Sequence, residues 1–241
     1  MAIAAYADPV IHAEPSTRVA YLRKVAALTF VGLILAAFSG TVSASVIFLL
    51  EGAASSRMVQ LVVIFGSYFI AHFVARRMVY SSAAPVKYLG FMAGSVFQGI
   101  AMGYLLLAAI LASLSTFGTP FVFVAQALFM TGLVAVGLLL YLMTGPKDLS
   151  YVKGALSMLF LPMMALMAIS FVFSSYIGGP LGIAMTLLFV VISVAGLLYQ
   201  LNQIIHKLPA TMYVEGAFEV TLGLLVLFWN ILVLLMRLQR R

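Results

Sequence analysis

Long apolar runs separated by short polar breaks dominate the sequence. Each run is close to the roughly 20 residues that a helix needs to cross a hydrocarbon core of about 30 Å. Hydrocarbon offers no partner to an unpaired backbone amide, so spans of this kind must be helical, and the runs lack the alternation of barrel strands. The pattern predicts an all-α integral membrane protein, a seven-transmembrane-helix bundle. The predicted spans are Val25–Leu50, Met58–Ala75, Val86–Ala112, Pro120–Met143, Gly154–Phe173, Pro180–Tyr199 and Thr211–Met236.

Composition supports this class and excludes several others. Of the 241 residues, 65% are hydrophobic and 8% are charged, against roughly 45–50% and 25% in soluble domains. Such a chain cannot cover a globular surface with polar groups, which excludes a soluble enzyme and a disordered regulator. The absence of cysteine excludes disulfides and thiolate chemistry. The net charge of +7 is scattered between the apolar runs, so we expect a lipid bilayer as partner and no nucleic acid.

The first residues and the distribution of basic residues predict the orientation. Residues 1–24 carry Asp8 and Glu14 ahead of the first apolar run, which is too long for a signal peptide. We interpret residues 1–24 as an N-terminal cytoplasmic tail and residues 25–241 as the membrane domain. With the N-terminus inside, nine Lys and Arg residues lie inside and four outside, which favours this orientation. A re-entrant last run would make the count twelve against one. We expect a bacterial inner membrane, with an organellar membrane as the other possibility.

Several short segments occur in a characteristic order from about residue 18 to the end. They are Tyr21-Leu22-Arg23-Lys24-Val25, Gln98-Gly99-Ile100, Ala127 with Thr131 and Gly132, Lys147-Asp148-Leu149-Ser150, Tyr199-Gln200-Leu201-Asn202-Gln203-Ile204, and Leu222 to Asn230. Together they resemble the Bax inhibitor-1 family of membrane proteins. The resemblance implies a seven-helix bundle with the last helix at its centre. It also implies, for some members, a proton-controlled calcium leak, and for others suppression of cell death or regulation of membrane proteases.

The same resemblance locates the leak at two aspartates on the last two spans, held by an arginine near the end of the second span. Here the matching positions are Gln200 and Gly223, and the arginine is Arg76 or Arg77. Two carboxylates sharing a site can act as a pH switch. Glutamine cannot titrate and glycine has no side chain, so that mechanism does not transfer to these positions.

A second set of polar residues allows two interpretations. Glu215 and Glu219 lie four residues apart on one face of the last span, and Asn230 continues roughly the same stripe. Glu219 could replace the missing aspartate and form a relocated polar or ion site with Gln200 and Arg76 or Arg77. Alternatively, both glutamates lie near the cytoplasmic interface, paired with Lys207, Arg76 or Arg77, and favour the positive end of the helix.

The remaining motifs concern packing rather than chemistry. Gly90 and Gly94, and likewise Gly99 and Gly103, lie four residues apart, a spacing that lets helices approach closely in lipid. The three histidines share no metal-ligand spacing, and no catalytic constellation is present. We therefore expect no enzyme, no metal and no cofactor.

Two functional hypotheses follow. One is a regulatory or structural partner, an accessory subunit of other integral membrane proteins. The other is a pH-dependent leak for calcium or other cations that uses Glu215 and Glu219, with protons controlling the flux.

Overall fold

The bundle is known from a computed structural model that describes residues 9–50, 56–143 and 179–239. In these residues six helices are long and apolar enough to cross a membrane. The pairing of Pro9 with Pro209 is an isolated bridge, and the described residues contain no β-strand. The predicted fifth span, Gly154–Phe173, lies outside the described residues. The structure therefore supports a polytopic all-α protein, and the total of seven spans stays a prediction.

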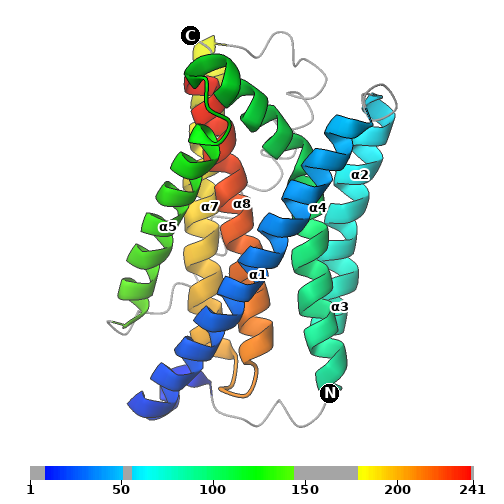
Figure 1. The fold of residues 1–241 in the computed structure, drawn as a ribbon. Helices are drawn as coiled ribbons and strands as arrows, with labels where there is room; N and C mark the ends of the chain where they lie inside the picture. The colour runs from blue at the N-terminus through cyan, green and yellow to red at the C-terminus, as the bar shows by residue number, and fades with distance from the viewer. Residues whose placement is uncertain (1–8, 51–55, 144–178, 240–241) are drawn as a thin grey trace.

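The helices run back and forth along one common direction (Figure 1). The second span consists of three consecutive helical segments, the middle one a π-helix. In chain order the elements are η2 (Val10–His12), α1 (Pro15–Leu49), α2 (Arg57–Phe69), η3 (Ile70–Ala75), α3 (Arg76–Val79), α4 (Ala84–Phe117), α5 (Val122–Met143), α7 (Gly179–Lys207) and α8 (Tyr213–Gln239).

Several helices extend beyond the apolar runs that predicted them. The first begins at Pro15 rather than Val25, because proline is favoured in the first turn of a helix. The second continues through Arg76 to Val79, although the arginines were expected to end it. The sixth predicted span continues to Lys207, through the expected loop. Hydropathy marks only the part of a helix inside hydrocarbon, and a helix can continue with polar residues beyond it.

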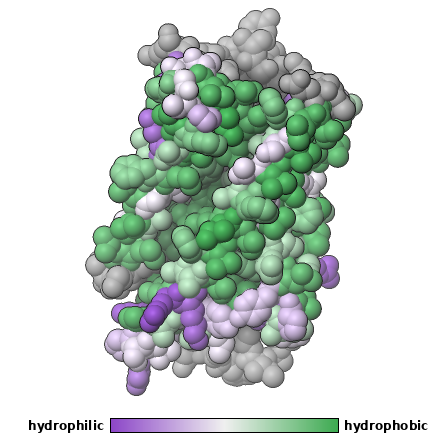
Figure 2. Space-filling model, viewed as in Figure 1, coloured by the Kyte–Doolittle hydropathy of each residue, from purple (hydrophilic) through white to green (hydrophobic). Residues whose placement is uncertain are grey.

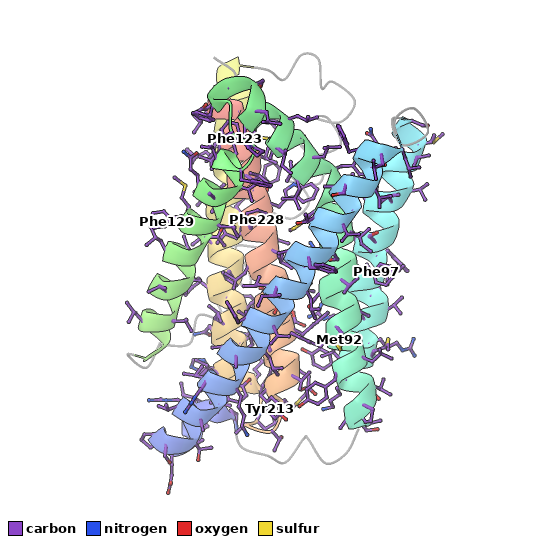
Figure 3. All side chains as sticks on the ribbon, in the orientation of Figure 1. Met92, Phe97, Phe123, Phe129, Tyr213 and Phe228 are labelled. Atoms are coloured by element: carbon purple, nitrogen blue, oxygen red, sulfur yellow. The ribbon has the colours of Figure 1, made fainter. Side chains whose placement is uncertain are left out.

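Helix α8 occupies the middle of the bundle. It contacts α1, α3, α4, α5 and α7. More than half of its most apolar stretch is buried inside the bundle, a larger share than in any other described span. Figure 3 shows the contrast between Phe228 on α8, which is 8% exposed, and Phe129, which points outward from α5 and is 67% exposed. The central position of the last helix agrees with what the resemblance implied. Its continuity over Tyr213–Gln239 favours a full span over a re-entrant segment.

The four glycines of α4 lie where other helices approach closely. A Cβ on Gly90 would lie 2.8 Å from the Val79 amide nitrogen, and one on Gly94 would collide with Phe218. Gly99 and Gly103 are contacted in the same way by α1. Two serine hydroxyls of α1 donate to α4 carbonyls across this interface, one of them at 3.0 Å to Val96. The glycine stripe is therefore used inside the bundle.

Candidate functional site

Glu219 is held between α8 and the end of the second span. Its Oε1 lies 2.8 Å from an Arg76 guanidinium nitrogen and accepts a hydrogen bond of 3.2 Å from the Tyr80 hydroxyl. Arg76 directly follows the π-helix, a rare element that occurs frequently at functional sites. The Arg76 side chain is 55% exposed and that of Glu219 is 14% exposed, so this pair lies at the edge of the bundle.

Glu215, one turn earlier on α8, forms a much more deeply buried pair. Its Oε1 accepts a hydrogen bond from the Lys87 ammonium group on α4, and its side chain is 1% exposed. Its Oε2 has no hydrogen-bond partner among the described residues, and neither has the buried hydroxyl of Tyr21 on α1. Gly216 makes room for that tyrosine, because a Cβ there would lie 2.6 Å from the hydroxyl oxygen.

Gln200 and Gly223 meet at the α7–α8 interface. A Cβ on Gly223 would collide with Oε1 of Gln200 and would lie 2.7 Å from a methyl carbon of Leu197. The Gln200 side chain therefore lies directly against the backbone of α8. Its Oε1 is buried and has no partner in the described part of the chain. The contact consists of a neutral amide and a glycine, and neither residue titrates.

Asn230 belongs to a separate contact further along α8. Its amide nitrogen donates to the Ser193 hydroxyl on α7 at 2.7 Å and to the Val226 carbonyl at 3.1 Å. Both bonds engage the amide nitrogen, and the one to Ser193 joins two helices. Asn230 is thus a link between α7 and α8, remote from both ion pairs along the helix.

The comparison with known families decides the identity. Residues 18–241 match the family described as "Inhibitor of apoptosis-promoting Bax1". The chain belongs to the Bax inhibitor-1 family. No curated protein and no solved structure matches it.

Within this Bax inhibitor-1 protein, the predicted polar residues divide into separate groups. Arg76 and Glu219 come together as an ion pair, while Arg77 is exposed and takes part in neither ion pair of the described residues. Glu215 pairs with Lys87, which was not among the expected partners Lys207, Arg76 and Arg77. Gln200 lies against Gly223 rather than in either ion pair.

The sequence interpretation missed two partners, Tyr80 and Lys87. They lie 139 and 128 residues from the glutamates that they contact. Their one signal is a position near the end of a predicted span: Tyr80 follows the second span, and Lys87 is the second residue of the third, Val86–Ala112. The Tyr80 hydroxyl is protonated at neutral pH, as in any tyrosine, and burial followed by the neighbouring Glu219 carboxylate raises its pKa further above the ordinary value of 10.0.

Two pockets in the described residues lie away from these polar contacts. One, near the end of α8, is lined mainly by α4 residues with Phe123, Met236 and Gln239. The other is an apolar groove of about 180 Å³ among α1, α5, α7 and α8. Neither is lined by Glu215, Glu219 or Gln200. The polar side chains thus act as contacts between helices.

Proposed function

We propose that this Bax inhibitor-1 family member is a non-enzymatic regulatory or structural partner of other integral membrane proteins. The observation that carries the proposal is the contact of Gln200 with Gly223. The resemblance assigns the paired aspartates to these positions, and the two positions do adjoin in space. A proton-sensitive pair has become a neutral contact on a scaffold whose close helix packing is retained.

The two ion pairs support the same proposal. Lys87 neutralises Glu215, and Arg76 neutralises Glu219. Both pairs connect the beginning of α8 to the helices around it, so they hold the central helix in place. A carboxylate engaged with a cationic side chain is a poor ligand for a passing cation. A rigid bundle with an inert centre suits a protein that acts through its surface.

A second candidate function, a pH-dependent cation leak, is favoured by one observation. Oε2 of Glu215 is buried and has no partner in the described residues, so it could accept a proton or a cation. The number of ligands argues against calcium, which takes six to eight oxygen atoms. Glu219 adds an oxygen on the same helix face, but it is already engaged by Arg76 and Tyr80.

Flux measurements distinguish the two candidates. The purified protein is reconstituted into liposomes loaded with a calcium-sensitive dye, and calcium entry is followed from about pH 5 to about pH 8, the range in which perturbed carboxylates and histidines titrate. The partner proposal expects flux that does not vary with pH. Flux that rises with pH and is lost in both Glu215→Gln and Glu219→Gln would establish the leak instead.

The partner role needs its own experiment. Native membranes are solubilised in mild detergent, and the protein is separated by native electrophoresis before and after chemical cross-linking. We expect a complex larger than the lone chain that contains one other membrane protein in fixed ratio. A monomer under all mild conditions, without cross-linked neighbours, would count against the proposal.

A further inference from the structure

The apolar groove opens on the face between α1 and α5. These two helices do not contact each other in the described residues, and α7 and α8 form the floor between them. Figure 2 shows a hollowed, largely hydrophobic surface on this face. Ala26 of α1 and Ala135 of α5 line the groove and leave room between the helices, while Phe30 and Leu139 stand at its sides.

The chemistry of the groove wall selects a hydrocarbon occupant. The lining is almost wholly aliphatic, and its one hydroxyl, that of Thr29, already donates to the Ala217 carbonyl at 3.4 Å. A polar solute would lose its hydration here without gaining hydrogen bonds. A helix with its side chains has a diameter of about 10–12 Å. The groove volume of about 180 Å³ is small for such a helix. A flexible acyl chain fits such a space better than a partner helix does.

Basic residues occur at one end of the same groove. Arg23 precedes Ala26 by three residues and Phe30 by seven, so all three lie on one face of α1. On α7, Lys207 follows the groove residue Ile204 by three positions. Both basic residues are exposed, and the two ion pairs of the described residues use other cations. Apolar walls with positive charge at one end match the two parts of an acidic lipid.

We propose that the groove between α1 and α5 binds one acyl chain of an anionic phospholipid, whose phosphate is held by Arg23 and Lys207. The aliphatic wall holds the chain through close packing, and the two cations select the negative headgroup over a zwitterionic one. Neither Gln200 nor Gly223 lines the groove, although Leu197 both lines it and adjoins Gly223. Lipid retention and calcium flux are measured separately, so this proposal and the proposed function can each fail alone.

Headgroup selection is tested by native mass spectrometry of the full chain, released from nanodiscs that contain equal amounts of phosphatidylglycerol and phosphatidylcholine. We expect the wild type to retain phosphatidylglycerol preferentially. Arg23→Gln should reduce that preference about fivefold, the effect of one cation near a membrane surface. Arg77→Gln is the matched control, because it removes the same charge from an exposed arginine away from the groove, and it should change nothing.

The chain-binding part is tested by filling the groove. Ala26→Phe and Ala135→Phe each place a ring in it, whereas Ala27→Phe adds the same ring to an exposed position of α1 that does not line it. We expect loss of the retained lipid in the first two variants and retention in the third, with circular dichroism to verify folding. If one groove variant does not fold, lipid retention by the other groove variant and by Arg23→Gln tests the proposal.

Three results would overturn the proposal. The first is a wild type that retains both lipids equally. The second is equal loss of selectivity in Arg23→Gln and Arg77→Gln, which would indicate general attraction of anionic lipid. The third is undiminished lipid retention in folded groove variants, which would place the lipid elsewhere or leave the groove to another occupant.

Discussion

Removing the Lys87 ammonium group should destabilise the bundle strongly. Lys87→Met keeps much of the apolar stem and leaves the Glu215 carboxylate, 1% exposed, without its cation. Breaking a buried ion pair by removing one partner costs about 3–5 kcal/mol, because a buried charge is left uncompensated. The double variant Lys87→Met/Glu215→Gln removes both charges together. We expect it to recover most of the lost free energy of unfolding, since a neutral replacement of a buried pair is often close to neutral in stability.

The pair between Arg76 and Glu219 supplies an internal control. The Arg76 side chain is 55% exposed, and we expect Arg76→Gln to cost only about 0.2–1 kcal/mol, the range of exposed ion pairs. The free energy of unfolding is measured in detergent micelles by SDS titration, with circular dichroism as the signal. Equal losses for Lys87→Met and Arg76→Gln, or a double variant no more stable than Lys87→Met, would refute the reasoning from burial.

Three further predictions concern packing, proton binding and helix linkage. Gly99→Leu should destabilise the bundle by at least about 1–3 kcal/mol, because the new side chain would collide with α1. Gly132→Leu is the control, since Gly132 has open space around it, and its thermal unfolding should be nearly unchanged. The raised pKa of Tyr80 means that the folded state holds this proton more tightly than the unfolded state, so stability falls as pH rises past the ordinary value of 10.0; Tyr80→Phe should reduce that fall in alkaline unfolding curves. Asn230→Ala should cost about 0.6 kcal/mol in chemical unfolding through loss of its interhelical hydrogen bond, and a loss above about twice that value would assign Asn230 a larger role.

Hydropathy was sufficient for the class of fold because a bilayer imposes one rule along the whole chain: an apolar run of this length must be a helix. It located all six spans of the described residues but not their ends, as the continuation of the second helix through Arg76 shows. A π-helix such as Ile70–Ala75 leaves no mark on hydropathy. Nevertheless, that segment directly precedes the arginine that pairs with Glu219.

The polar contacts could be predicted from the sequence only in part, for a related reason. Helical periodicity places Glu215 and Glu219 on one face, since it depends on residues four apart. The choice of partner depends on how distant helices pack, which is why Lys87 was missed. Of the three expected cations, Arg76 forms an ion pair in the described residues. The contact of Gln200 with Gly223 required both the resemblance, which singled out the two positions, and the structure, which shows them adjoining.

Calcium flux through reconstituted wild-type protein, compared with the variant Gln200→Asp/Gly223→Asp, tests the central claim most directly. Replacing Gln200 by the shorter aspartate also removes the amide that would collide with a side chain at position 223. The account predicts that wild-type flux does not respond to pH, and that the double variant gains a flux that does, because two adjoining carboxylates titrate as a pair. A wild type with pH-dependent calcium flux of its own would contradict the account.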